Sequence, residues 1–98
     1  MPKGYLIAEL EITNMAGYEE YRRQAPATIA AYGGRFVVRA GEAKLMEGSG
    51  GLGRMIVLEF DSVERAMAWY NSPEYQEVLP HRLKNSTGRA IIVAGHGD

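Results

Sequence analysis

The sequence predicts an α+β fold built on one four-stranded antiparallel sheet, and three observations lead to that prediction. Four short segments have the alternating or continuously apolar pattern that is typical of strands. Helical stretches separate the first of these segments from the second, and the third from the fourth. No repeat or linker divides the chain. The order strand, helix, strand, strand, helix, short helix, strand is that of a split βαβ arrangement.

Length and composition limit the classes of protein to which the chain can belong. Its 98 residues fit a single domain, residues 1–98, of modest stability as a monomer. The 11 basic and 12 acidic side chains give a net charge of −1, which argues against a nucleic-acid partner. Without cysteine there is no disulfide framework or thiolate metal site. No apolar stretch can span a bilayer and no signal peptide is evident, so we expect a cytoplasmic protein without a membrane partner.

The first part of the chain has the pattern of a strand, a helix and a second strand. Gly4–Ile12 alternates imperfectly between apolar and mixed positions and predicts the first strand. Asn14 is suited to cap the following helix, Pro26 is expected to kink or divide it, and Gly33-Gly34 to end it. Residues 35–40 alternate again and predict the second strand.

A glycine-rich segment separates the second strand from the third. Residues 43–46 are expected to resume the second strand after a kink at Gly41. Residues 48–53 match the dinucleotide-binding pattern G-x-G-x-x-G, but a strand rather than a helix follows them, so the pattern favours a flexible hairpin loop. Arg54–Phe60 is the third predicted strand, apolar except for Glu59 near its end.

Two helical segments and a last strand complete the chain. Asp61 or Ser62 is expected to cap a helix, with Trp69 at the edge of its apolar stripe. Ser72 caps a further short helix, and residues 89–94 form the fourth predicted strand.

The topology predicts which surfaces are buried. Right-handed crossovers lead us to expect the order 4-1-3-2, with the first and third strands side by side and parallel at the centre. The helices cover one face of the sheet. The other face is expected to carry a patch too apolar for water, formed by Tyr5, Ile7, Val37, Met55 and Val57. We therefore expect a homodimer in which two sheets pack face to face into one barrel.

A cluster of ionisable residues is predicted on this apolar face. With a hairpin tip near residues 49–50, Arg39 falls opposite Glu59. Glu9 on the neighbouring first strand points the same way, and Arg35 lies further along the second strand on that face. An arginine fork suits a carboxylate, and a carboxylate with a pKa raised by burial can act as a general base. Glu59 and Glu9 are therefore candidate catalytic residues, and Arg39 and Arg35 candidate ligand-binding residues. The alternative is a structural ion pair at the rim of the sheet.

Three further residues are weaker candidates for the same ligand pocket. Tyr5 shares the face, Trp69 either packs in the core or lines the pocket mouth, and His81 lies on a short helix. No neighbouring residues complete a triad or a metal set with His81. The carboxylates and the two histidines lack metal-ligand spacing, so neither a metal site nor a cofactor is predicted.

Four motifs resemble those of a known bacterial family. They are Gly4-Tyr5, Tyr32-Gly-Gly-Arg-Phe36, Glu59-Phe60 and Trp69-Tyr-Asn-Ser-Pro-Glu-Tyr75. Over nearly its whole length the chain resembles the domain of unknown function 1330 family. The resemblance implies a ferredoxin-like member of the dimeric α/β-barrel superfamily, which includes cofactor-free monooxygenases, chlorite-dismutase-like haem proteins and stress-response proteins. A histidine is common in the family at the position of Glu9, so a proton transfer by that residue is either absent here or falls to a carboxylate.

The leading functional hypothesis is a small-molecule pocket in each half of the barrel. Arg39 would anchor an anionic or phenolic ligand, and Glu59 or Glu9 would be the base in a cofactor-independent, monooxygenase-like or isomerase-like reaction. The alternative is a non-enzymatic dimeric binding or stress-related interaction protein, in which the charges only fix the register of the strands.

Overall fold

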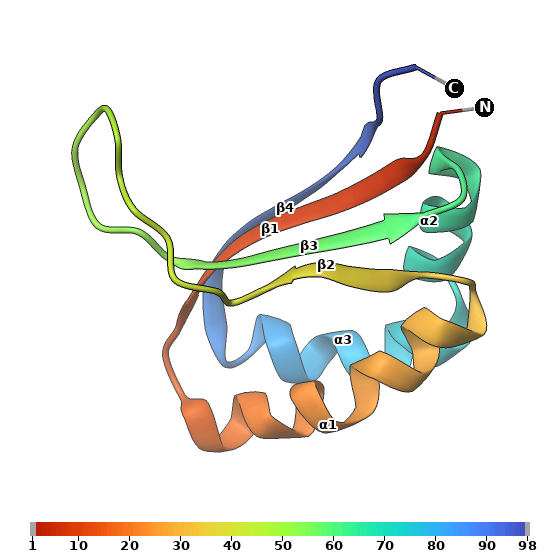
Figure 1. The fold of residues 1–98 in the computed structure, drawn as a ribbon. Helices are drawn as coiled ribbons and strands as arrows, with labels where there is room; N and C mark the ends of the chain where they lie inside the picture. Colours follow the sequence, from red (N-terminus) through yellow and green to blue (C-terminus); the bar gives the residue numbers. More distant parts are fainter. Residues whose placement is uncertain (1, 98) are drawn as a thin grey trace.

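The computed structural model describes residues 2–97 and contains four strands and three helices (Figure 1). In chain order these are β1 (Gly4–Ile12), α1 (Met15–Ala31), β2 (Arg35–Arg39), β3 (Arg54–Phe60), α2 (Val63–Tyr70), α3 (Pro73–Leu83) and β4 (Ser86–Ala94). The order of elements is the predicted one. β4 begins at Ser86 rather than at Arg89, because it pairs with β1 along its whole length.

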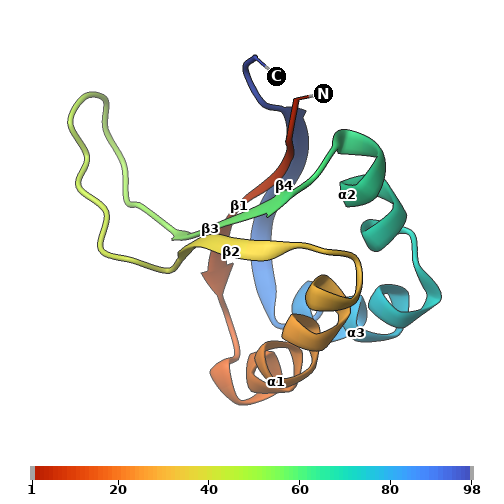
Figure 2. The same cartoon turned by 45° about the vertical axis from the view of Figure 1, so that its right-hand side comes forward.

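The strands form one antiparallel sheet in the order β2-β3-β1-β4, with the helices on one side of it (Figures 1 and 2). This confirms the predicted strand order and the ferredoxin-like arrangement. The expectation that β1 and β3 run parallel was wrong, because Gly4 pairs with Phe60 and Leu10 with Arg54. The crossover through α1 makes β2 parallel to β1, and the connection from β2 to its neighbour β3 then reverses the direction.

Each helix begins at a side chain that accepts a hydrogen bond from the backbone. Asn14, Ser62 and Ser72 each accept from the N–H three residues later, at 3.1–3.3 Å. Of the two residues considered for the start of α2, Ser62 is therefore the cap. Pro26 lies inside α1 without dividing it, and α1 packs along α3.

β2 contains a β-bulge that the alternating sequence did not predict. Phe36 pairs with Leu58 and Val38 pairs with Val57, which leaves Val37 as an extra residue without a partner on β3. Because successive side chains of a strand point to opposite faces, one extra residue exchanges the faces for everything after it.

The segment between β2 and β3, residues 40–53, is an irregular arm. It rises on the side of the sheet away from the helices (Figures 1 and 2). The expected resumption of a strand at residues 43–46 is absent. At the base of the arm Ala40 has φ 59°, a left-handed conformation that is unusual for alanine, and its N–H donates to Met55 O at 2.8 Å.

The core between the helices and the sheet is built around stacked aromatic rings. Trp69 is fully buried, with ring-centroid distances of 5.4 Å to Phe60 and 4.0 Å to Tyr75. Its Nε1 donates to Thr28 Oγ1 at 3.1 Å, which ties α2 to α1. The structure therefore places Trp69 at the centre of the core and not at the edge of its helical stripe.

The other side of the sheet, which we call the open face, is covered by no helix of the described chain. The strand register assigns to it Tyr5, Ile7, Glu9, Glu11, Arg35, Val38, Met55, Val57, Glu59, Arg89, Ile91 and Val93. Ile91 is 52% exposed and Val93 41%. The predicted apolar surface is present, with Val38 rather than Val37 opposite Val57 because of the bulge.

Candidate functional site

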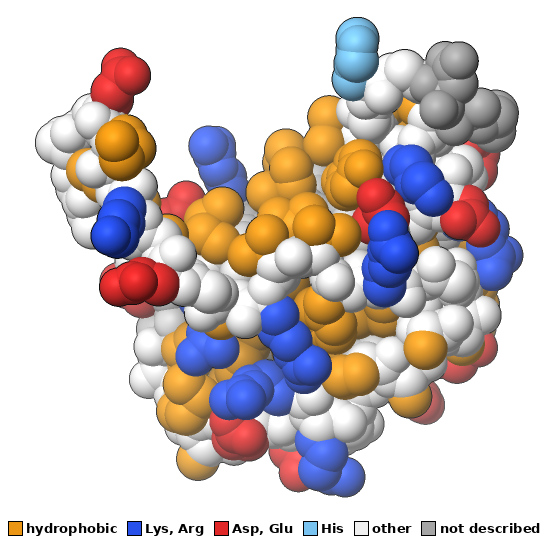
Figure 3. Space-filling model, viewed as in Figure 1, with side chains coloured by type: hydrophobic (Ala, Val, Ile, Leu, Met, Phe, Trp, Pro, Cys, Tyr) orange, Lys and Arg blue, Asp and Glu red, His pale blue; other side chains and the backbone are white. Residues whose placement is uncertain are grey.

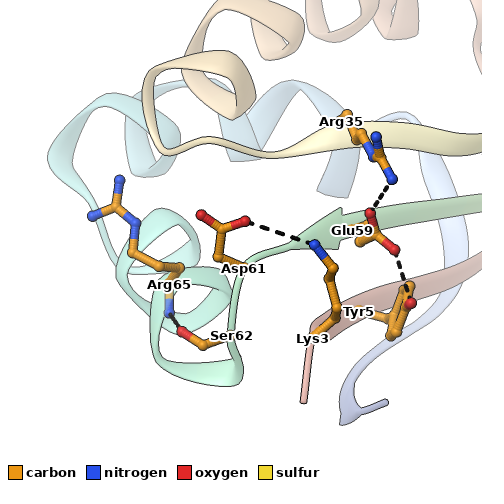
Figure 4. A network of polar contacts seen from close by, with 7 residues as sticks. All are labelled: Lys3, Tyr5, Arg35, Glu59, Asp61, Ser62 and Arg65. Atoms are coloured by element: carbon orange, nitrogen blue, oxygen red, sulfur yellow. Dashed lines mark hydrogen bonds and ion pairs between the residues drawn. The ribbon is translucent and has the colours of Figure 1, made fainter. Parts of the chain in front are cut away.

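A polar cluster on the open face joins β1, β2 and β3 (Figure 4). Glu59 accepts a hydrogen bond from the Tyr5 hydroxyl at 2.8 Å through Oε2, and its Oε1 lies 2.5 Å from Arg35 Nη2. The Glu59 side chain is 12% exposed and that of Arg35 71%. Close by, Lys3 Nζ lies 3.9 Å from Asp61 Oδ1. The structure therefore brings together three of the predicted site residues.

Arg39 is not part of this cluster, because the bulge changes the register. The predicted hairpin placed Arg39 opposite Glu59, but Glu59 pairs with Arg35, and Arg39 pairs with Ile56. Arg39 therefore lies on the helix side of the sheet, where its guanidinium carbon is 4.2 Å from the centroid of the Phe36 ring.

Glu9 lies on the open face but toward the other end of β1. Tyr5 is the residue opposite Glu59, and Glu9 follows four residues later, roughly 13 Å along the strand. Oε2 of Glu9 accepts a hydrogen bond from the N–H of Gly53 at 2.9 Å, where the arm returns to the sheet. The two carboxylates therefore do not form one cluster.

The surroundings of Glu59 make it a weaker base than an ordinary carboxylate. The hydrogen bond from Tyr5, together with the nearby Arg35, lowers the pKa of Glu59 against the opposing effect of burial. The same hydrogen bond raises the pKa of the Tyr5 phenol, which stays protonated as the donor near neutral pH. A general base works best with a pKa near the working pH, so this geometry favours a structural role for the cluster.

A cavity of about 140 Å³ lies on the opposite side of the sheet, between α1 and the strands. Most of its lining is apolar and comes from α1 and the three strands nearest to it: Leu6, Ala8, Leu10, Ala25, Pro26, Ile29, Phe36, Ile56 and Leu58. In Figure 3 basic side chains gather below the sheet around an area of hydrophobic side chains. The cavity therefore combines an apolar interior with a basic rim.

Four arginines line this cavity: Arg22, Arg39, Arg54 and Arg82. Among the described residues that line it there is no carboxylate. Arg22 is paired with Glu19 at 2.8 Å, whereas the other three have no acidic side chain of residues 2–97 at ion-pair distance. Arg82 is buried, and Arg39 is exposed. The cavity therefore attracts negative charge.

Tyrosine hydroxyls adjoin the buried end of the cavity. The hydroxyls of Tyr21 and Tyr75 are hydrogen-bonded at 2.8 Å, and burial raises the pKa of both phenols. The guanidinium carbon of Arg82 lies 5.9 Å from the centroid of the Tyr21 ring, and that of Arg54 5.7 Å from the Tyr18 ring. These groups place hydrogen-bond donors and positive charge at the cavity.

Two of the weaker candidates lie away from both sites. Trp69 is in the core and does not line the cavity. His81 is half-buried on α3, on the helix side, and its backbone oxygen accepts from Asn85 Nδ2 at 2.7 Å. Of the predicted site residues, the structure joins Tyr5, Arg35 and Glu59, and places Arg39 in the cavity.

Sequence reasoning missed the cavity, although one signal for it was present. Arg82 falls inside the apolar stripe of α3, and a buried arginine needs either a partner or a ligand. Tyr18 and Tyr21 follow the helical period of α1, which is typical of residues that face a core. Arg39 and Arg54 flank the arm, and their convergence depends on the bulge.

Two classes of site are not formed by the part of the chain that is described. Within residues 2–97 no three histidine or acidic side chains come together in a way that would hold a metal ion. No helix in that range has the length and apolar character required to cross a membrane.

Solved structures share this fold at low sequence identity. A protein of unknown function from Rhodopseudomonas palustris has a TM-score of 0.79 at 15% identity, over 99% of this chain and 85% of that chain. SnoaB, a cofactor-independent oxygenase from Streptomyces nogalater, has a TM-score of 0.66 at 11% identity, over 100% and 97%. A dimeric protein of unknown function from Bacteroides fragilis, with a ferredoxin-like fold, has a TM-score of 0.58 at 12% identity, over 94% and 95%. These similarities establish the fold alone.

Sequence comparison identifies the family. No curated protein matches the chain. The sequence profile of the family described as Domain of unknown function (DUF1330) matches residues 3–96, which is nearly the whole chain. As its motifs predicted, the chain belongs to the DUF1330 family.

Proposed function

We propose that this protein binds a small organic anion with an aromatic body in the cavity between α1 and the sheet. The supporting observation is an apolar lining that includes four arginines and, among the described residues, no carboxylate. The apolar lining favours burial of a hydrocarbon ring, and guanidinium groups suit a carboxylate or a phenolate.

The volume of the cavity limits the size of the ligand. An engineered apolar cavity of about 150 Å³ in another protein binds benzene, and this cavity measures about 140 Å³. One aromatic ring therefore fits. Its charged substituent would point toward the rim, where Arg54 is half-buried and Arg39 exposed.

Benzoate and its neutral isostere benzamide test the proposal by isothermal titration calorimetry. We expect benzoate to bind at least about tenfold more tightly, because a hydrogen bond to a charged group contributes about 1.5–3 kcal/mol. Arg54→Met removes the charge and keeps a flexible apolar side chain beside Tyr18. We expect it to weaken benzoate binding by at least about tenfold.

Two further variants make the result specific. Arg23→Met is the matched control, because Arg23 is also an arginine, lies on α1, is paired with Glu20 and does not line the cavity. Glu59→Gln distinguishes the two candidate sites, because removing this carboxylate would change the affinity only of a ligand bound on the open face. Equal affinities for benzoate and benzamide, or unchanged benzoate binding in Arg54→Met, would contradict the proposal.

Catalysis on such a ligand is a second candidate function. Cofactor-independent oxygenation and isomerisation both begin with the loss of a proton from the substrate. Nearby arginines lower the pKa of a bound phenol, which favours phenolate without a carboxylate base in the cavity. The similarity to SnoaB supports this chemistry only at the level of fold. Oxygen uptake with one-ring phenols, lost in Arg54→Met, would support it; binding without turnover would favour the non-enzymatic alternative.

We further propose that the protein works as a dimer in which two open faces pack together. Ile91 and Val93 leave apolar surface in water, and packing against a second copy would cover it. The similar protein from Bacteroides fragilis is described as dimeric. Sedimentation equilibrium measures the mass directly, and a monomer at micromolar concentration would contradict this proposal.

A further inference from the structure

The arm, residues 40–53, leaves three large apolar side chains exposed. Met46 is 85% exposed, Leu45 47% and Leu52 46%. Holding a long irregular segment in place is entropically unfavourable, and most hairpin connections are far shorter. Apolar side chains clustered on such a segment indicate a surface that contacts another molecule.

The arm and the open face border the same hollow. Figure 3 shows hydrophobic side chains on the arm and across the floor of the hollow, up to the C-terminal end of β4. The floor includes Ile91 and Val93, which are exposed to a similar degree as Leu45 and Leu52. A molecule seated on the open face would therefore touch the arm as well.

The charges of the open face favour a second copy of this chain as that molecule. Arg35 is paired with Glu59, and Glu9 lies opposite Arg89 on the neighbouring strand. With Glu11 included, the face carries two basic and three acidic side chains and is nearly neutral. Two identical surfaces that pack across a two-fold axis need balanced charge, because an excess of positive or negative charge on both would cause repulsion.

An arm enlarges the contact that the open face can make with a second copy. Its four strands are five to nine residues long, so the face projects to roughly 500 Å² at strand spacings of about 4.8 Å. A standard stable interface buries about 800 Å² on each partner. One arm from each copy would add contact surface to that of the sheet.

We propose that the arm of each protomer clasps the second copy, with Leu45 and Met46 buried in the contact. This inference rests on the open-face dimer proposed above. By two-fold symmetry each copy extends one arm and receives one. The arm lies between Arg39 and Arg54, both of which line the cavity, so the partner copy would hold the segment that connects two arginines of the anion site.

Met46→Glu tests the clasp by sedimentation equilibrium. Met46 is exposed in the single chain, so this substitution leaves the fold of the protomer unchanged and places a charge in each of two symmetric contacts. We expect the dimer dissociation constant to rise at least tenfold. Leu83→Glu is the matched control, because Leu83 is 60% exposed on α3, on the helix side, and we expect no change there.

Ile91→Glu, on the floor of the hollow, separates the clasp from the dimer itself. If Ile91→Glu dissociates the dimer and Met46→Glu dimerises like the wild type, the clasp is wrong and the open-face dimer stands. If the wild-type chain is a monomer at micromolar concentration, the dimer fails and the clasp fails with it.

The chain has no cysteine, which allows an independent measurement on the arm. A nitroxide spin label attached to Met46→Cys is expected to be immobilised in the dimer. The label should become mobile when Ile91→Glu is added. A label that stays mobile in a dimer of confirmed mass would overturn the clasp.

Discussion

Glu59 is tied to β1 and β2 by a phenol and a guanidinium, and both partners affect its ionisation. Because its pKa is lowered in the folded chain, its ionised form stabilises that chain. This contribution is complete above the ordinary carboxyl pKa of about 4.3 and is lost as the pH falls through the lower pKa of the folded state.

We therefore expect Glu59→Gln to be less stable than the wild type at neutral pH and to lose that difference on acidification. Urea unfolding at pH 7, 5 and 3 measures it. Glu42→Gln, on the exposed arm, is the control and should follow the wild type at every pH. A deficit in Glu59→Gln that stays constant across this range would show that charge is not the cause.

Trp69 joins α2 to α1 and to the sheet, and its replacement by phenylalanine removes one hydrogen bond and part of the packing. Thr28 still donates to Ala25 O at 2.8 Å, so its hydroxyl is not left without a partner. We expect Trp69→Phe to lower the free energy of unfolding by about 1–2 kcal/mol, and Trp69→Ala by about 3–5 kcal/mol. Urea unfolding followed by circular dichroism measures both, and a Trp69→Phe variant as stable as the wild type would contradict the role of the bond.

The junction of β2 with the arm contains a strained residue. Ala40 has φ 59°, a conformation that costs a non-glycine residue about 1–2 kcal/mol, whereas glycine loses about 0.5–1 kcal/mol through its freedom in the unfolded chain. We expect Ala40→Gly to stabilise the protein by about 0.5 kcal/mol, measured by urea unfolding. Ala43→Gly, elsewhere on the arm and without a positive φ, should be neutral or slightly destabilising. A destabilised Ala40→Gly would mean that the strain is absent.

The same junction shows how far the sequence predicts the fold and the site. The sequence predicts the strand order, helix caps such as Asn14, and the open-face positions of Tyr5 and Glu59. The structure confirms these expectations. The bulge at Val37 has no local signature, because β2 contains no glycine of the kind that often marks a bulge. One unpredicted residue moved Arg39 from the open face to the cavity.

The cavity itself depends on tertiary packing. Its space lies between α1 and the strands, and the spacing of those layers is set by side chains from several elements at once. The helical period places Tyr18 and Tyr21 on one face of α1, but periodicity does not distinguish a filled core from a core that contains a void. The sequence therefore placed Arg39 on the wrong side of the sheet and opposite Glu59, whereas the observed register pairs Arg35 with Glu59.

In the whole molecule the sheet separates two surfaces, and the arm connects them. The cavity opens on the helix side, and the proposed partner lies against the open face. Residues 40–53 begin after Arg39 and end before Arg54, so a partner that orders the arm also restricts two arginines of the anion site. Ligand binding and dimer formation are then linked, and linkage acts equally in both directions.

This linkage predicts that saturating benzoate strengthens the dimer by the square of the factor by which dimer formation strengthens benzoate binding at one site, because each dimer has two sites. We expect a factor on the order of five for each site, at the lower end of typical coupling, because only two of the four cavity arginines adjoin the arm. Sedimentation equilibrium with and without saturating benzoate measures the change in the dimer dissociation constant. Calorimetric titration of benzoate into the monomeric Ile91→Glu variant and into the wild-type dimer measures the change in benzoate affinity. Benzamide is the control for solvent effects. Equal benzoate affinity in the monomer and the dimer would show that the arm does not transmit the presence of the partner to the cavity.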